Sequence, residues 1–197
     1  MDDTEFWSLI DQVDHADRVD PRFTHALSVR LARLPIPRIV AFHVLAMDKC
    51  DQLLNWELWE AAGIIHQGQS VSEDRFVDFR LWVIAQGERT FNDALDDPDL
   101  LAEHPALVRL AGKGCGSPDM ESMLGVAEMA FDQVLAKLHP AYRERVEYPE
   151  ELDRRPREIP YPAPPPKIGD AQRVRALYPQ LVELFTPAVV APPSLAR

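Results

Sequence analysis

The sequence contains little cysteine and little glycine. Its 197 residues include two cysteines, Cys50 and Cys115. A disulfide framework needs more cysteines at closer spacing, so we expect both thiols to stay reduced in a cytoplasmic protein, Cys50 as a buried thiol and Cys115 in a loop. The eight glycines are scarce in the first half of the chain, and β-branched residues rarely cluster. These absences disfavour a small disulfide-stapled fold and a β-sheet fold.

Long apolar runs and excess positive charge are also absent. The longest apolar run, 39–47, contains His43 and is far shorter than the ~20 residues of a membrane-spanning helix. The first five residues are acidic where a signal peptide would be basic and then apolar, so we expect no secretory signal. The net charge of −11 argues against general affinity for nucleic acid or for anionic membranes. We therefore expect a soluble protein with neither partner.

Hydrophobic residues make up 46% of the chain and recur at intervals of three and four, which is typical of amphipathic helices. The sequence thus predicts an all-α fold, an irregular multi-helix bundle. We expect a helical core domain over 1–140 and a proline-rich arm over 141–169 that either packs on the domain or acts as a linker. A C-terminal helix over 170–186, kinked at Tyr178-Pro179, and a loose tail over 187–197 should follow.

Caps and prolines place the individual helices. The segment from His104 to Leu110 is expected to be a connection, and Ser117-Pro118-Asp119 to cap a long helix that ends at His139-Pro140. Before the arm, helices are predicted over the following ranges: 3–13, 21–34, 37–53, 56–67, 72–86, 88–95, a short stretch that starts at the 96–99 turn and runs through 101, and 117–138.

Three of the four tryptophans lie between residues 55 and 87. Carboxylates among aromatic rings lose solvation, which raises a carboxyl pKa and can create a general acid or base. The plainer interpretation is a helix–helix core whose charges reach the rim or pair with Arg80. The candidate site on this stretch comprises eight residues: Trp56, Glu57, Trp59, Glu60, Asp74, Asp78, Arg80 and Trp82.

Five segments of the sequence together resemble a bacterial family of helical domains, the domain of unknown function 4240. They are Phe6-Trp7, Leu34 to Phe42, Glu57-Leu58-Trp59-Glu60-Ala61-Ala62, Phe76 to Gly87 and Asp97-Pro98-Asp99-Leu100-Leu101. The resemblance covers about residues 4–102. The chain departs from the family pattern at Glu57, where aspartate is expected, and at Gly63, where an aromatic residue is usual. The resemblance implies a helical fold and no particular activity.

Other patterns in the chain carry weaker signals. His43, Met47 and Cys50 are spaced for one helical face, but a buried apolar face with a satisfied histidine is the favoured interpretation, and no metal or cofactor is predicted. The glycine-rich loop 112–116 has no phosphate-binding spacing and is interpreted as a connector. A Pro-x-x-Pro-x-Lys spacing within 162–167 fits polyproline recognition with low specificity.

Two functional hypotheses follow from these features. The favoured one is a non-catalytic binding or regulatory module that acts through contacts with another protein or with itself, any small-molecule ligand being undetermined. The alternative is a carboxylate-dependent hydrolase or transferase whose site includes Glu57, Glu60, Asp78 and Arg80. The alternative requires that at least two carboxylates face one enclosed cavity and that one has a perturbed pKa.

Overall fold

The computed structural model describes residues 1–13, 21–67, 71–113, 118–157 and 171–186. All regular structure in these ranges is helical, as the sequence predicts, and no strand occurs in them. The α-helices are α1 (Asp3–Asp11), α2 (Pro21–Leu31), α3 (Ile36–Gln52), α4 (Trp56–Ile65), α5 (Glu73–Ala85), α6 (Glu88–Asp96), α7 (Pro105–Lys113), α8 (Val126–Lys137), α9 (Pro140–Arg143), α10 (Ala171–Leu177) and α11 (Pro179–Phe185). Three 3₁₀ helices lie between them: η1 (Pro98–Glu103), η2 (Glu121–Met123) and η3 (Glu150–Asp153).

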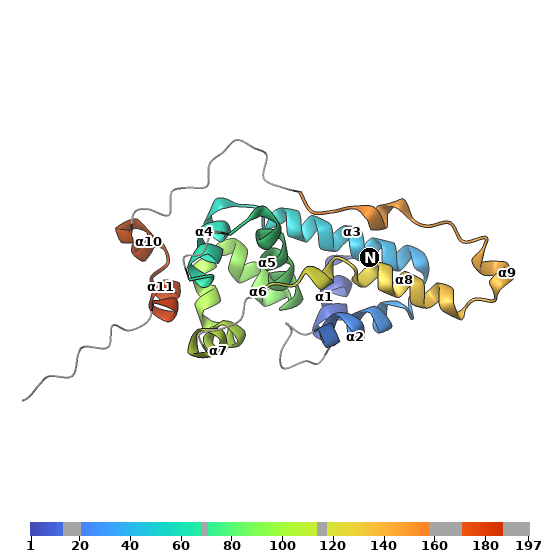
Figure 1. Ribbon diagram of the computed structural model, residues 1–197, viewed down its shortest axis with the longest axis horizontal. Helices are drawn as coiled ribbons and strands as arrows, with labels where there is room; N and C mark the ends of the chain where they lie inside the picture. The colour runs from blue at the N-terminus through green and yellow to red at the C-terminus, as the bar shows by residue number, and fades with distance from the viewer. Residues whose placement is uncertain (14–20, 68–70, 114–117, 158–170, 187–197) are drawn as a thin grey trace, which may run out of the picture.

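The helices arrange themselves in two groups along one long axis (Figure 1). One group holds α1, α2, α3 and α8, with α8 packed against both α2 and α3. The other holds α4, α6, η1 and α7, and it carries α10 and α11 at its outer side. Helix α5 joins the groups because it contacts α3, α4 and α6.

The core centres on α5, as the tryptophan-rich sequence suggests. Trp82 is fully buried and stacks on Phe79 with 5.8 Å between ring centroids, while Trp59 meets Phe76 at 4.6 Å. A second set of rings ties α1 into the same core, since Phe6 lies 4.9 Å from Phe42 of α3. Aromatic rings in such tilted or offset contacts add to the free energy of burial.

Local capping explains where several helices begin. The Asn55 side chain accepts from the Leu58 N–H at 2.7 Å, and the Ser72 hydroxyl accepts from the Arg75 N–H at 3.2 Å. These caps satisfy amide groups that the first turn of a helix leaves without partners. Helix α5 ends at Ala85, just before Gly87, whose φ of 102° favours glycine.

Two expected segments differ from the structure. Residues 104–110, predicted to be a connection, lie mostly within helix α7, whose first turn is capped by the His104 ring: its Nδ1 accepts from the Ala106 N–H at 3.3 Å. The helix expected to start at Ser117 begins instead at Val126, after η2. The reason is tertiary, because the Met120 N–H donates to the carbonyl of Asp78 on α5 at 3.1 Å and diverts the chain there.

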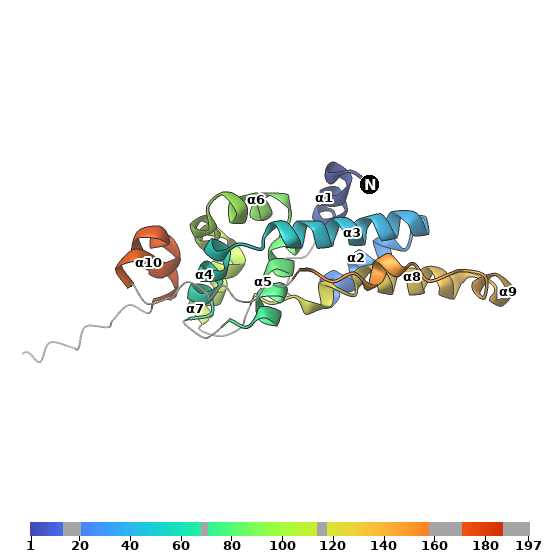
Figure 2. The same cartoon turned by 90° about the horizontal axis from the view of Figure 1, so that it is seen from above.

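The chain after α8 runs back along α3, with η3 against that helix (Figure 2). The last described helices, α10 and α11, pack on the outer side of α4 and η1. They are separated at Tyr178, where the sequence predicts a kink. None of the described helices combines the length and apolarity needed to cross a membrane.

Candidate functional site

The four candidate carboxylates have different surroundings. Glu57 and Asp74 are exposed, on α4 and α5 respectively. Glu60 is 1% exposed and contacts the C-terminal helices, whereas Asp78 is half-buried close to the carboxylates of the η2 region. The described residues therefore do not bring the four carboxylates into one shared contact.

The three tryptophans of the candidate set lie in the aromatic core. Trp56 and Trp59 are 5.7 Å apart between ring centroids, and Trp82 packs edge-on to His104 at 5.3 Å. The indole Nε1 of Trp82 is buried with no acceptor among the described residues. These contacts show that the three tryptophans pack in the core.

Arg80 contacts main-chain carbonyls. Its side chain is 1% exposed, and its two terminal nitrogens donate to the carbonyls of Cys50 at 2.9 Å and Arg157 at 3.1 Å. The guanidinium also lies 4.9 Å from the ring centre of Phe76. Burial lowers the pKa of Arg80 and raises that of the Cys50 thiol to about 12, so this thiol is not a nucleophile near neutral pH.

The Asp78 carboxyl has a raised pKa. Loss of solvation raises it to about 6, with further contributions from the carboxylates of Glu121, Asp119 and Asp74. Nearby, the buried His66 ring lies 3.6 Å from Asp119, and burial lowers the pKa of His66. The Asp78 carboxyl can therefore bind a proton near pH 6.

Glu60 is the centre of a polar contact between α4 and α10–α11. One carboxylate oxygen accepts from Arg173 at 2.6 Å, and the other accepts from the Tyr178 hydroxyl at 3.2 Å. The same hydroxyl lies 3.1 Å from the carbonyl of Glu57. Burial and the Glu60 carboxylate raise the pKa of Tyr178. The phenol therefore stays protonated, and the carboxylate has two donors.

Asp99 makes a second polar contact with the same segment. Its carboxylate, 3% exposed on η1, accepts from the backbone N–H groups of Gln180 at 3.1 Å and Leu181 at 2.9 Å. Those amides belong to the first turn of α11 and have no partner within a helix. Asp99 thus acts as an N-terminal cap supplied from another element, 81 residues earlier in the chain. We call the surface of α4, η1 and α7 that contacts α10–α11 the docking face, with Glu60 and Asp99 as its polar contacts.

A further set of contacts holds residues 150–157, which we call the strap, against α3 and α5. The His43 ring is 3.0 Å from the carbonyl of Arg154, and Asp51 accepts from the Arg157 N–H at 2.6 Å. The Arg154 guanidinium reaches Asp48 at 2.7 Å and Asp51 at 3.1 Å. Residues 150–157, which belong to the expected arm, are therefore in contact with the helical core.

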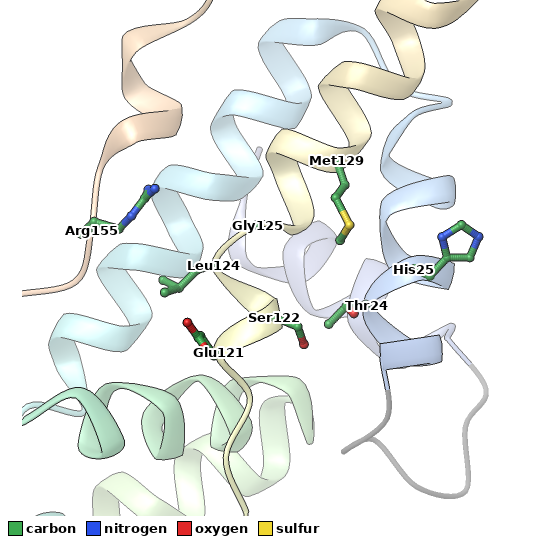
Figure 3. Close-up of a pocket in the computed structure, with 8 residues that line it drawn as sticks. All are labelled: Thr24, His25, Glu121, Ser122, Leu124, Gly125, Met129 and Arg155. Atoms are coloured by element: carbon green, nitrogen blue, oxygen red, sulfur yellow. The ribbon is translucent and has the colours of Figure 1, made fainter. Parts of the chain in front are cut away.

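A pocket of about 650 Å³ opens between α2, η2, the start of α8 and the strap (Figure 3). Its volume is in the range of ligand sites, and its two charged side chains, Glu121 and Arg155, come from η2 and the strap. None of the eight candidate residues predicted from the sequence lines it, although Glu121, whose carboxylate helps to raise the pKa of Asp78, does. The lining comprises Thr24, His25, Glu121, Ser122, Leu124, Gly125, Met129 and Arg155.

Other expectations have different outcomes. His43, Met47 and Cys50 are all buried on α3, and no group of three ligands that could hold a metal ion occurs among the described residues. Most of the glycine-rich loop, including Cys115, and the Pro-x-x-Pro-x-Lys segment fall outside the described ranges. Their predicted roles stay predictions.

Comparison with protein families gives a match over residues 1–133 to the model described as a protein of unknown function, DUF4240. The chain belongs to this family. No match was found among curated proteins, and none among solved structures. The DUF4240 match includes α1 to α7 and most of α8, and it ends before the strap, α10 and α11.

Each of these contacts with the C-terminal segments joins a residue inside the DUF4240 match to a residue beyond its end. The buried charged side chains Glu60, Arg80 and Asp99 lie inside the matched region, and so does His43. Their partners on the strap and on α10–α11 lie beyond residue 133. Sequence reasoning selected Glu60 and Arg80 from their aromatic surroundings. It missed Asp99 and His43 as contact residues because nothing local shows their distant partners.

Proposed function

We propose that this protein is a non-catalytic binding module that acts through protein–protein contacts, and that its docking face is the binding surface. The observation that carries the proposal is the pair of buried carboxylates, Glu60 and Asp99. Both lie in the family-matched region and are satisfied by a helical segment outside it.

Physical chemistry favours this use of the two carboxylates. A buried carboxylate without a partner is strongly unfavourable, so any segment that covers Glu60 and Asp99 must bring hydrogen-bond donors to them. The donors they have are an arginine, a phenol and the free amides of a helix start, which are the groups that a helical peptide presents to a groove. The alternative, a carboxylate-dependent enzyme, has less support because Glu60 and Asp78 have separate neighbours.

Cleavage of the chain between the strap and α10 tests the proposal. We would introduce a specific protease site within residues 158–170 of the full chain, cleave it, and measure by native mass spectrometry whether the C-terminal fragment remains bound. We expect a stable two-fragment complex and, after dilution and separation, rebinding of the fragment to a core that is still folded by circular dichroism.

Matched substitutions locate the binding surface. Glu60→Gln and Asp99→Asn should each weaken fragment binding about tenfold or more, since a charged hydrogen bond contributes roughly 1.5–3 kcal/mol. Glu88→Gln and Asp96→Asn, which change exposed carboxylates of α6, should leave it unchanged. If the core unfolds once the fragment departs, α10–α11 is a part of the fold rather than a bound ligand, and the proposal is wrong.

A further inference from the structure

We infer that the docking face recognises a helical segment of another protein that carries the chemistry of α10–α11, and that α10–α11 is a competitor built into the same chain. This inference rests on the proposed function, and it adds the kind of partner and the way in which access is controlled. The partner would present an arginine, then Tyr-Pro five residues later, at the start of an amphipathic helix.

The apolar contribution comes from one stripe of the segment. Val174, Tyr178, Leu181 and Phe185 are its buried residues, at spacings of four, three and four. The spacing of four puts Val174 beside Tyr178 on the α10 side of the break and Leu181 beside Phe185 on α11. Apolar pairs at this spacing are the pattern by which amphipathic helices enter apolar grooves. Leu181 is fully buried, so a polar residue there would be strongly unfavourable.

The polar contribution sets the position and the direction of the segment. Asp99 accepts from two consecutive amides, Gln180 and Leu181, which are the adjacent free amides that the start of a helix presents. Glu60 fixes the turn before that start by holding Arg173 and the Tyr178 hydroxyl. A helix docked in the opposite direction would bring carbonyl oxygens towards Asp99 and lose both hydrogen bonds.

Two observations argue that the occupant is exchangeable. The segment's contacts with the core are concentrated on the docking face: α11 contacts η1, α4 and α7, and α10 packs on α11. The face also belongs to the family-matched region, which ends before the segment begins. The matched region of this chain thus contains the acceptors Glu60 and Asp99 but not their donors, and a donor segment from another chain fits them by charge complementarity.

A competition experiment on the cleaved full-length chain tests the recognition. A fluorescent peptide with the sequence of residues 170–186 serves as the probe, and unlabelled variants displace it in an anisotropy assay. We expect the parent peptide to compete fully, Arg173→Glu to compete at least tenfold more weakly, and Leu181→Asp at least a hundredfold more weakly. Glu183→Gln, at an exposed position of α11, should compete like the parent.

The outcomes separate the inference from the function on which it rests. If Arg173→Glu and a scrambled peptide of the same composition compete as well as the parent, the stated partner chemistry is wrong although the face still binds helices. If no peptide displaces or replaces the probe, and the cleaved fragment does not rebind, the proposed function itself fails.

The competitor role is tested on uncleaved chains. The probe should bind the intact chain carrying Leu181→Asp about as tightly as it binds the cleaved chain. It should bind the intact unmodified chain at least tenfold more weakly than either. Near-ultraviolet circular dichroism of the variant establishes that its core is retained. Equal binding to both intact chains would overturn the competitor role. A concentration-dependent dimer that Leu181→Asp abolishes would show instead that the occupant is a second copy.

Discussion

At the scale of single residues, Asp78 has a pKa raised to about 6 by burial and by neighbouring carboxylates. A carboxyl whose pKa is higher in the folded state than in the unfolded chain stabilises the fold fully below its unfolded pKa, near 4. That contribution disappears as the pH rises through 6. Charged Asp78 is therefore unfavourable for folding at neutral pH.

We expect Asp78→Asn to change stability in a pH-dependent way. Relative to the unmodified chain, the variant should gain stability between pH 4 and pH 7, by about 1 kcal/mol because solvent screens this partly exposed group. Urea denaturation across this pH range measures the difference. Asp96→Asn on α6 is the control, since Asp96 is exposed and is not among the carboxylates that raise the pKa of Asp78. A difference that is constant with pH would contradict the assignment.

Arg80 illustrates a different kind of buried charge. It binds the carbonyl of Cys50 near the end of α3 and the carbonyl of Arg157 in the strap, so it joins two elements through their main chains. Removing it leaves buried acceptors without donors, which is costly in a dry environment.

We expect Arg80→Met to lower the free energy of unfolding by about 3 kcal/mol and to release the strap. Limited trypsin digestion should then cut faster after Arg154 and Arg157, whereas the bond after Arg155 precedes Pro156 and resists trypsin. Arg89→Met, in a side chain that is 88% exposed, is the matched control. Unchanged cleavage in Arg80→Met would show that Asp51 and His43 hold the strap without it.

At the scale of elements, α10 and α11 have seven residues each and are separated at Tyr178-Pro179. Helices this short are marginal in water because nucleation is costly. The cap at α11 comes from Asp99, which lies outside the segment.

A peptide of residues 170–186 should therefore be mostly unfolded alone and become helical when it binds the docking face. Circular dichroism of the peptide, before and after titration with a core lacking its own fragment, measures the change. If the free peptide is already helical, the Asp99 cap and the apolar stripe do not drive its folding.

The elements also show what the sequence can and cannot predict. Helices α4 and α5 follow from Asn55, Ser72 and periodic apolar residues, all of which are local signals. Helix α7 was missed because its cap, His104, is not a common capping residue. The pairing of Glu60 with Arg173 spans 113 positions, and no local pattern indicates it. Glu60 belongs to the candidate site predicted from the sequence, but its contact with Arg173 is visible only in the fold.

At the scale of the whole molecule, the aromatic core and the C-terminal contacts are distinct sources of stability. Phe42 is deep in the core against Phe6, whereas Phe185 is at the docking face. Deletion of a buried aromatic side chain costs roughly 3–5 kcal/mol wherever the surroundings cannot collapse.

We expect Phe42→Ala to destabilise the entire chain by that amount and Phe185→Ala to detach α10–α11 while the core stays folded. Hydrogen exchange separates the two results: the first variant should lose protection in α3 and α5, and the second only in α10, α11 and η1. Global loss of protection in Phe185→Ala would show that the two groups of contacts unfold as one unit.

The order of the docking face and its occupant along the chain has a consequence during synthesis. The ribosome completes α4 and η1 about eighty residues before it completes α11. At ~5–20 residues per second, this leaves an interval of roughly 4–16 s. During that interval Glu60 and Asp99 have been translated before the segment that supplies their hydrogen-bond donors is complete. In the nascent chain, both carboxylates must therefore stay hydrated or bind donors from another molecule.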